Sequence, residues 1–591
     1  MASNRGYRTS EDKRMQLPHN PSARQDAHWW PWIAALLIAA LFAGIGLRDP
    51  WPADEPRFAQ VAREMVESGQ WLFPTRGGEF YPDKPPVFMW LIALFYQLTG
   101  QLKIAFLLPS ALAGLGTLWL VFDLGRRLWG ENVARSAVLV LAFTPQFLLQ
   151  AKAAQIDAVA CFWITLGCYG LVRHFLLGPA WGWYAASWVA MALGIVTKGV
   201  GFLPALMLIP LAIWRRPVTA SGQQVWCMRT WWGPTLMLGT LALWLVPMWV
   251  AVERIQSPEL LAYRDNILLK QTAERYANAW HHIKPWHYYL STALPSMWFP
   301  LVVLFLLQIR SIRKLWPSSV ALRVLLSWVA LVLLFFSISP GKREVYILPA
   351  LPMSALALAY VWEQAPEKGR RTASLLLRGA LAVVGLLLML LAAMALFAPD
   401  RLHHRADDYA DAIAALAPGL LILGLALSSI VWLLRKRALF EQLALASLLA
   451  WLFISFWLWP SLNTHRTPRA VMQELEQSLA PEAEVGMLEF KEQFLLFANR
   501  PLVHFSYLAP LPQQEWNAWR WIRSAPNRVL LLPDHLALQC FDLTKKRVLG
   551  EAHRRNWVLL DASAARESCG RAVDRVPYRY VPVKKDILLS N

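Results

Sequence analysis

Long apolar runs are the feature that most restricts how this chain can fold. Two of them are "WIAALLIAALFAGIGL" at 32–47 and "LLLRGALAVVGLLLMLLAAMALF" at 375–397. A helix of about 20 predominantly apolar residues is long enough to cross the hydrocarbon core of a bilayer. Only 16% of the residues are charged, whereas soluble proteins carry about 25%. The sequence therefore predicts a membrane protein that crosses the bilayer many times.

Basic residues are concentrated in short loops beside the predicted spans. The formal net charge is +19, and examples of these loops are "GRRLW" at 125–129, "RSIRK" at 310–314 and "EKGRR" at 367–371. An excess of Lys and Arg in short loops is typical of the cytoplasmic side. We therefore predict cytoplasmic loops and a cytoplasmic tail over 1–28. The chain has no motif for nucleic acid, so no nucleic-acid partner is expected.

This orientation is consistent with about 13 spans, which places the C-terminus outside. The predicted spans are 29–47, 105–122, 132–150, 158–176, 181–196, 201–213, 231–252, 287–309, 320–337, 344–361, 375–397, 418–434 and 439–459. The apolar segment 85–100 is the ambiguous one. Counting it as a span would invert every later loop, so we interpret it as an interfacial or re-entrant helix.

The expected fold is an all-α polytopic membrane domain over 29–459, followed by a small α/β domain over 460–591. The first external loop is 48–104. The tail mixes helical stretches with β-like runs at 484–490, 528–533 and 556–563, and its length is near that of a small domain. Cys540 and Cys569 both lie in this tail. They can form a disulfide in an oxidising compartment, with two free buried thiols as the alternative.

The external stretch "DEPRFAQVAREM" at 54–65 predicts an amphipathic helix. Pro56 suits its first turn, where no N–H is needed. One apolar face follows the spacing i, i+3, i+4, i+7 and contains Phe58, Val61, Ala62 and Met65. We expect this face to lie against the membrane surface. Asp54 has two compatible interpretations, a helix N-cap or a catalytic carboxylate.

Other external segments end in cations close to the bilayer. They are "YPDKPP" with Lys84, "QIDAV" with Asp157, "TKG" with Lys198, the loop 253–286 with Arg275, and "GKREVYILP" with Lys342, Arg343 and Tyr346. Cations can hold a phosphate, and a carboxylate can take a proton or stabilise a developing charge. The pattern therefore indicates an enzyme that acts on a phosphate-linked lipid.

Several other functions are disfavoured by the same residues. The chain has no Gly-rich nucleotide loop, so no nucleotide cofactor is expected. His281 and His282 are adjacent, which is not metal-ligand spacing, so no metal site is predicted, while a divalent metal remains open. Charges are almost absent from the middles of the spans, which disfavours an ion-coupled transporter.

In that order and spacing, these motifs resemble the C-type (GT-C) membrane glycosyltransferases, which use polyprenyl-phosphate sugars. Within them the chain is most similar to the aminoarabinose transferases of lipid A and to protein O-mannosyltransferases. The resemblance extends to the 13-span plan and the outer C-terminal domain. Asp83 stands where the aminoarabinose enzymes typically carry Glu, and Pro86 stands where they carry Ile. Those departures leave the sugar and the acceptor open.

The resemblance implies a role for each of a set of residues. Catalytic roles fall on Asp54 and Asp157, and donor-phosphate binding falls on Arg57, Lys84, Lys198 and Arg275. The residues expected to line the cavity are Glu55, Tyr81, Asp83, Lys342, Arg343 and Tyr346.

The expected function is inverting transfer of a sugar, with 4-amino-4-deoxy-L-arabinose as the leading candidate. The donor would be a polyprenyl (undecaprenyl) phosphate and the acceptor lipid A or a related envelope molecule. A protein O-mannosyltransferase and, from another class, a lipid or solute transporter are the alternatives. The resemblance also implies a bacterial inner membrane, with the active site and the C-terminal domain in the periplasm.

Overall fold

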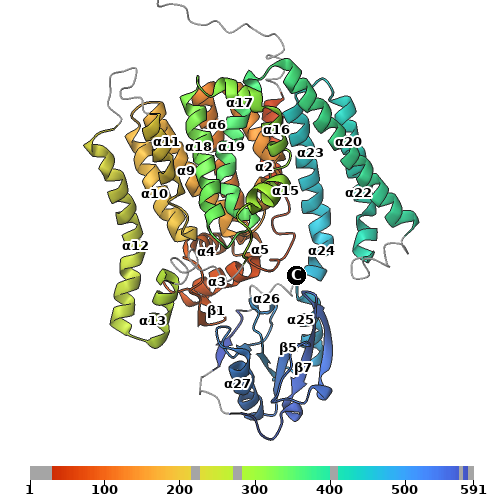
Figure 1. Cartoon of the computed structure of the whole chain (residues 1–591). Helices are drawn as coiled ribbons and strands as arrows, with labels where there is room; N and C mark the ends of the chain where they lie inside the picture. The colour runs from red at the N-terminus through yellow and green to blue at the C-terminus, as the bar shows by residue number, and fades with distance from the viewer. Residues whose placement is uncertain (1–28, 215–225, 270–281, 399–409, 571–576, 584–591) are drawn as a thin grey trace, which may run out of the picture.

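The computed structural model describes residues 29–214, 226–269, 282–398, 410–570 and 577–583. A bundle of helices occupies one end of the molecule and a sheet with short helices occupies the other (Figure 1). Between them lie α3 (Glu55–Ser68), α4 (Val87–Thr99), α5 (Leu102–Ala105) and the two-stranded β1 (Thr75–Arg76) and β2 (Glu79–Phe80). The segment that carries half of the candidate site residues thus lies between the two parts of the chain.

The bundle is built from helices that run from α2 (Trp30–Phe42) to α24 (Trp459–Arg466). The others are α6 (Leu108–Trp129), α7 (Glu131–Phe143), α8 (Pro145–Ala151), α9 (Ile156–Leu176), α10 (Trp181–Lys198), α11 (Leu208–Ile213), α12 (Trp232–Ile255), α13 (Pro258–Asp265), α15 (Leu294–Met297), α16 (Leu301–Leu307), α17 (Ile309–Leu315), α18 (Val320–Ile338), α19 (Leu351–Gln364), α20 (Glu367–Phe397), α22 (Ala410–Leu433) and α23 (Leu439–Phe453).

Eight helices among the described residues are long and apolar enough to cross a membrane, and two bent pairs raise the number to ten. Every one of the 13 predicted spans coincides with a helix or a bent pair, but α2, α10 and the helix at Leu203–Ile213 are not among those ten. The prediction of a multi-spanning membrane protein is confirmed, and the number 13 stays a prediction. Segment 85–100 forms the 13-residue α4, whose length of about 20 Å is short for a crossing.

Proline bends both broken pairs. α7 and α8 meet at 74°, and Thr144 at the break has extended backbone angles just before Pro145. The helix Tyr289–Met297 and α16 meet at 111°, and Pro300 precedes α16. A residue before proline is pushed out of the helical region because the proline ring clashes with it. The first bend directs the chain from α8 toward the start of α9, where Asp157 lies.

The C-terminal region contains a six-stranded mixed sheet in the order β6-β7-β5-β3-β4-β8. The central β3 is parallel to both β4 and β5, and the remaining pairs are antiparallel. The strands are β3 (Glu484–Met487), β4 (Leu502–His504), β5 (Arg528–Pro533), β6 (Arg547–Ala552), β7 (Arg555–Asp561) and β8 (Tyr578–Tyr580). The three β-like runs of the sequence fall on β3, β5 and β7.

The two faces of this sheet pack against different partners. Leu530 and Leu532 point toward α27 (Leu511–Arg523) and share its apolar core. Leu531 points the other way, as the period of two in a strand requires, into a core with α25 (Arg469–Ser478) and α26 (Glu492–Leu495). That second core also contains the apolar side chains of α3 and α4, including Phe58 and Phe88. The sheet region and the external segment are therefore packed together.

Helix α3 is buried on both sides. The predicted apolar face is enclosed, with Phe58 at 2% exposure and Val61 and Ala62 at 0%. The opposite face is not left to solvent, because Arg63 and Glu64 are also buried. Arg63 donates to the carbonyl of Leu495 at 2.9 Å. The expectation of a helix on the membrane surface needs this correction: the C-terminal region covers the face that points away from the bundle.

Gly77 allows the closest approach between the external segment and the sheet region. Its φ is +68°, and an added Cβ would lie 2.7 Å from Phe490 and 2.8 Å from His504. Its N–H donates to the buried Glu64 carboxylate at 2.6 Å. Nε2 of His504 lies 2.9 Å from the Gly77 carbonyl. Only glycine fits this position without moving one of the two parts.

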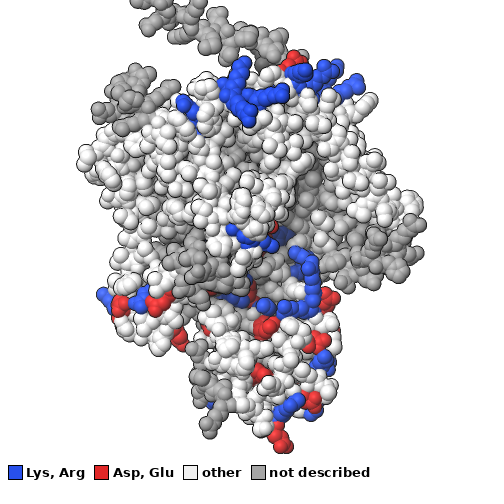
Figure 2. Space-filling model, in the orientation of Figure 1, with Lys and Arg blue, Asp and Glu red and all other residues white. Residues whose placement is uncertain are grey.

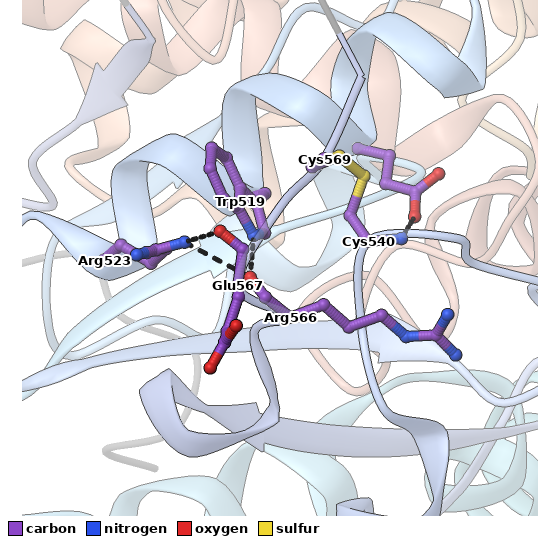
Figure 3. Close-up of a disulfide and its surroundings, with 7 residues drawn as sticks. Trp519, Arg523, Cys540, Arg566, Glu567 and Cys569 are labelled. Atoms are coloured by element: carbon purple, nitrogen blue, oxygen red, sulfur yellow. Dashed lines mark hydrogen bonds between the residues drawn. A yellow bond between two sulfur atoms is a disulfide. The ribbon is translucent and has the colours of Figure 1, made fainter.

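Cys540 and Cys569 form a disulfide beside α27 (Figure 3), so the two-thiol alternative is not what the structure shows. The bond fastens the segment after β7 to the segment before β6. Two side chains of α27, Trp519 and Arg523, donate to the backbone carbonyl of Arg566 on the same segment. The crosslink and these bonds hold the outer edge of α27 in place.

Removal of this crosslink should destabilise the C-terminal region. Cys540→Ser with Cys569→Ser opens a loop with a sequence separation of 29, and a native disulfide of this size contributes about 3 kcal/mol. Differential scanning fluorimetry in detergent should show a lower melting temperature for the double variant and for reduced wild type. Cys227→Ser, at a free cysteine, is the control. Equal melting of oxidised and reduced wild type would contradict the expectation.

The pH dependence of stability should report the burial of His504 beside Gly77. Burial lowers the pKa of His504 to about 4, although the hydrogen bond to the Gly77 carbonyl opposes this. The folded protein thus keeps the imidazole neutral, while the unfolded chain binds a proton near pH 6.5. Stability is present above pH 6.5 and falls by up to about 1.4 kcal/mol per pH unit toward pH 4.

His504→Phe should flatten this slope between pH 6.5 and 4.5, because Phe can keep the stacking on Phe490 without titrating. His535→Phe is the control, since that side chain is 50% exposed. Chemical unfolding at a series of pH values measures both. The expectation fails if His504→Phe and wild type lose stability in parallel.

Candidate active site

A cavity of about 740 Å³ opens where the bundle, the external segment and the sheet region meet. Its charged lining residues are Asp54, Arg57, Asp83, Lys84, Asp157, Lys198 and Arg343. Its apolar wall includes Ile195 and Val196 of α10 and Leu241, Trp244 and Leu245 of α12. Seven residues proposed from the sequence as charged site residues are thus brought together from five separate parts of the chain.

Asp54 sits at the N-cap position of α3, but its carboxylate makes no capping hydrogen bond. It faces the cavity between two guanidinium groups. Nη1 of Arg57 lies 3.7 Å from one oxygen and Nη2 of Arg343 lies 3.7 Å from the other. At 3.7 Å, both contacts are ion pairs, because hydrogen bonds would have shorter distances between nitrogen and oxygen. The carboxylate is therefore held by charge and still has its oxygens available for a ligand.

Asp157 lies in the first turn of α9, where a negative charge is favoured by the helix dipole. It is not a cap either, because Gln155 occupies that position. Its carboxylate forms a salt bridge with Lys198 at the end of α10. The Lys198 ammonium also lies 4.6 Å from the centre of the Tyr346 ring. Asp157, Lys198 and Tyr346 therefore form one group on the cavity wall.

Arg57 lines the cavity and is held from behind by a buried carboxylate. Its side chain is 26% exposed, and Nε lies 3.5 Å from the buried carboxylate of Glu492. Burial lowers the pKa of Arg57, but the neighbouring Tyr81 and Glu492 more than compensate and raise it above its usual value. Burial also raises the pKa of Tyr81. Arg57 is therefore a permanent cation with one side turned to the cavity.

Lys84 and Asp83 form one stretch of the cavity rim. The Lys84 ammonium donates to the backbone carbonyl of Asp83 at 3.0 Å, and both residues line the cavity. Pro85 and Pro86 follow directly, and proline fixes one backbone angle at each position. The two prolines limit how far this rim can move.

Glu55 lies behind the cavity, not on it. Its carboxylate forms a buried salt bridge with Arg48. The same carboxylate accepts from the N–H of Trp51 at 2.8 Å and from the N–H of Ala154 at 2.9 Å. Glu55 thereby connects the start of α3 to the segment just before Asp157.

Lys152 supports the same junction from the bundle side. Its ammonium donates to the carbonyls of Ala40 at 2.6 Å and Ala43 at 2.7 Å. These carbonyls are at the end of α2, where helix geometry leaves them without partners. Arg48 donates to the carbonyl of Lys152 at 3.2 Å. Nothing in the sequence indicates these roles, because Lys152 and Arg48 each simply follow an apolar run.

The remaining predicted residues lie beside the cavity or outside the described chain. Tyr81 is fully buried next to Arg57. The Lys342 ammonium donates to the carbonyls of Ser339 and Lys284, so it stabilises the loop that carries Arg343. Arg275 lies outside the described residues.

Three kinds of lining residue were not predicted. α12 contributes Trp244 to an apolar wall, His282 lies at the edge, and Leu508 comes from the sheet region. His282 was noted from the sequence only as half of an adjacent histidine pair, while Trp244 and Leu508 have unremarkable local sequences. Only the packing of distant segments brings the three to the cavity. Within the described ranges, no group of three His, Cys, Asp or Glu side chains is arranged to hold a metal ion.

The arrangement suits a reaction at an anionic, lipid-linked substrate. Arg57, Lys84 and Arg343 present cations around a carboxylate, and an apolar wall continues from them. Buried or half-buried cations stabilise a developing phosphate charge more strongly than cations in water do. Asp54 is placed to accept a proton or to stabilise positive charge.

Two families match parts of the chain. The family described as dolichyl-phosphate-mannose-protein mannosyltransferase matches residues 83–250. The Alg9-like mannosyltransferase family matches residues 277–416.

Curated relatives are similar over a longer stretch. Undecaprenyl phosphate-alpha-4-amino-4-deoxy-L-arabinose arabinosyl transferase 1 of Pseudomonas fluorescens is 30% identical over 382 residues, which cover 61% of this chain and 65% of that protein. The enzyme of the same name from Aeromonas hydrophila is 28% identical over 373 residues, covering 61% and 65%. The match thus spans just under two thirds of the length of these relatives.

Solved structures show the same fold. ArnT from Cupriavidus metallidurans bound to undecaprenyl phosphate has a TM-score of 0.69 at 20% identity, over 92% of this chain and 100% of that one. Its apo structure gives 0.67 over the same shares. The resemblance to the GT-C membrane glycosyltransferases is confirmed by these matches together.

Asp54 and Glu55 are adjacent acids with opposite surroundings, and their amide variants should separate them. Asp54→Asn removes no capping bond, so the free energy of unfolding should change by less than about 0.5 kcal/mol. Glu55→Gln leaves Arg48 buried without its partner, which costs about 3 to 5 kcal/mol. Thermal unfolding of the two purified variants measures the difference. Equal effects would show that Asp54 has a structural role as well.

Proposed function

We propose that this GT-C membrane protein is an inverting glycosyltransferase. In this proposal it moves a sugar from an undecaprenyl phosphate donor to lipid A or a related cell-envelope acceptor. The observation that carries the proposal is the cavity at the junction of bundle and external segment, where Asp54 lies between Arg57 and Arg343. The names of the curated relatives specify undecaprenyl phosphate and 4-amino-4-deoxy-L-arabinose, and we propose that sugar for this chain.

The donor would lie with its phosphate against the cations and its isoprenoid chain along the apolar wall. Arg57 and Lys84 are the proposed phosphate ligands, joined by Arg275 from the loop before Lys284. Lys198 is held by Asp157, so its positive charge reaches the cavity only in part. Trp244 and Leu245 of α12 line the same cavity, and an apolar lining suits a long apolar tail.

The transfer step makes one bond and breaks another at the sugar C1. An acceptor oxygen attacks C1, the bond from C1 to the phosphate oxygen breaks, and undecaprenyl phosphate leaves with the added negative charge. Arg57 and Lys84 would stabilise that charge. If the acceptor is a hydroxyl, Asp54 takes its proton. If the acceptor is a phosphate, no base is needed, and Asp54 stabilises positive charge at C1.

The neighbouring residues would hold these groups in place. Asp157 with Lys198 and Tyr346 forms one wall, and we propose that Asp157 takes part in catalysis from there. Glu55, Tyr81, Asp83 and Lys342 would support the cavity, and Arg343 would hold Asp54.

The proposed orientation puts the cavity and the C-terminal domain, residues 460–591, in the periplasm of a bacterial inner membrane. Basic residues gather at the end of the bundle opposite the sheet (Figure 2), where α17 and the start of α20 carry Arg310, Arg313, Arg370 and Arg371. Such a distribution supports a cytoplasmic location for that end. The Cys540–Cys569 disulfide supports an oxidising compartment for the other. Thirteen crossings with a cytoplasmic tail over 1–28 satisfy both.

A second candidate function is protein O-mannosyl transfer. It is favoured by the family match over residues 83–250. The same cavity would then hold a mannosyl phosphate lipid, and Asp54 would activate a Ser or Thr hydroxyl of a polypeptide.

The test is sugar transfer by purified full-length protein in detergent, where no gradient exists and transport cannot be scored. The donor is undecaprenyl phosphate aminoarabinose, and the acceptors are lipid A and, separately, a Ser/Thr-rich peptide with a mannosyl donor. We expect product with lipid A and a rate at least about 100-fold lower for Asp54→Asn, as for loss of a catalytic carboxylate.

Glu489→Gln is the control, because that carboxylate lies away from the cavity and pairs with Arg555. Transfer only to the peptide would favour the second candidate function. Absence of transfer to either acceptor, with the protein folded, would overturn both.

A further inference from the structure

The sheet region contributes a buried carboxylate that contacts one of the cations lining the cavity. Glu492 begins the short helix α26, and its side chain is 4% exposed. Each of its oxygens faces a different arginine of the external segment. Oε1 lies 3.5 Å from Nε of Arg57, and Oε2 lies 2.6 Å from Nη2 of Arg76. A buried carboxylate from the far end of the chain thus joins a cavity cation to a cation that does not line the cavity.

The charges of the two arginines keep the buried Glu492 carboxylate ionised between them. Burial raises the pKa of Glu492, but Arg76 and Arg57 outweigh that effect and hold it below its usual value. Glu492 is therefore ionised at neutral pH. The Arg76 guanidinium also lies 4.2 Å from the centre of the Tyr507 ring. Arg76 is thus held by the sheet region on two sides, by the Glu492 carboxylate and by the Tyr507 ring.

Arg57 is attracted in two directions. Asp54 on the cavity side lies 3.7 Å from Nη1, and Glu492 on the buried side lies 3.5 Å from Nε. With Glu492 present, the guanidinium is held between the two carboxylates and turns one edge to the cavity. Without it, Coulomb attraction would draw Arg57 onto Asp54. That movement would neutralise both groups that the proposed reaction needs.

Other contacts hold the two parts in register around this pair. Ser506 donates to Glu79 at 2.6 Å, and the Tyr507 hydroxyl donates to the carbonyl of Phe80 at 2.7 Å. Leu508, the next residue, lines the cavity. The segment that carries Tyr507 therefore reaches from the docking contacts to the cavity itself.

We infer that Glu492 is a positioning residue for Arg57, so that the phosphate-binding side of the cavity is complete only when the sheet region is docked. The inference rests on the proposed function, because it takes the ligand of Arg57 to be a lipid-linked phosphate. It assigns the sheet region a part in donor binding, beyond that of an attached domain.

Direct binding of undecaprenyl phosphate to the purified full-length protein tests the inference. Glu492→Gln keeps the shape of the side chain and removes its charge. We expect the dissociation constant to rise roughly 10- to 100-fold, as for a misplaced binding group, with a parallel rise in the donor KM. If Glu492 acted only through its negative charge, removing that charge would make an anion bind more tightly, which is the opposite result. Unchanged or tighter binding overturns the inference.

Arg76→Gln is the matched control, because it breaks the other half of the same salt bridge at the same interface. It leaves Glu492 with Arg57, so we expect the dissociation constant to stay within about threefold of wild type, as for a group outside the ligand site. A loss as large as that of Glu492→Gln would show that the interface as a whole matters, and would overturn the positioning role. If Glu492→Gln does not fold, the double variant with Arg76→Gln restores the charge balance and should bind as weakly as expected for Glu492→Gln alone.

Arg57→Gln separates this inference from the proposed function. If wild type binds undecaprenyl phosphate and Arg57→Gln does not, the phosphate site stands, and the result for Glu492→Gln decides the positioning role alone. If Arg57→Gln binds as wild type does, or wild type does not bind, the proposed donor site is wrong and the inference falls with it.

Discussion

One buried carboxylate, Glu55, joins the two halves of the candidate active site. It neutralises Arg48, accepts the N–H of Trp51 at the start of α3, and accepts the N–H of Ala154 before α9. The neighbouring residue Asp54 and the residue three positions after Ala154, Asp157, are two of the three carboxylates that line the cavity. Their separation is therefore set by a group that does not line the cavity. A buried charge of this kind is costly unless all of its partners are present, which makes the geometry all-or-none.

The charges on the cavity wall suit a substrate with little net charge to add. Among the described lining residues, four cations face three carboxylates. The phosphodiester that links a sugar to a lipid carries a single negative charge, which offsets the excess of one cation on the wall. In the proposed reaction, departure of the sugar would leave a phosphate with more negative charge, which the same cations would then hold. Opposed charges a few ångströms apart in a half-buried site thus serve both binding and the reaction.

Local sequence was sufficient for the residues at the ends of helices. Asp54, Arg57, Asp157 and Lys198 each stand next to an apolar run whose orientation follows from the basic loops, so their common side of the membrane was predictable. Their closeness came from the resemblance. Glu55 was predicted to line the cavity, but its side chain points away from the cavity to the buried Arg48. The direction of a side chain cannot be read from the sequence. Glu492 and Leu508 were out of reach because their contacts join segments more than 400 positions apart, where periodicity carries no information.

The same long-range contacts have a consequence for synthesis. Arg63 of α3 bonds to Leu495, 432 residues later in the chain. At about 5 to 20 residues per second, a ribosome needs roughly 20 to 90 seconds to make that stretch. During this time α3 has left the ribosome, yet Arg63 and the Gly77 turn have nothing from the sheet region to pack on. The cavity can therefore assemble only after almost the whole chain has been made and its last segment delivered to the same side of the membrane. A chain that ended before the sheet region would retain Asp54 and Asp157 but would lack Glu492, which contacts Arg57, and Leu508, which lines the cavity.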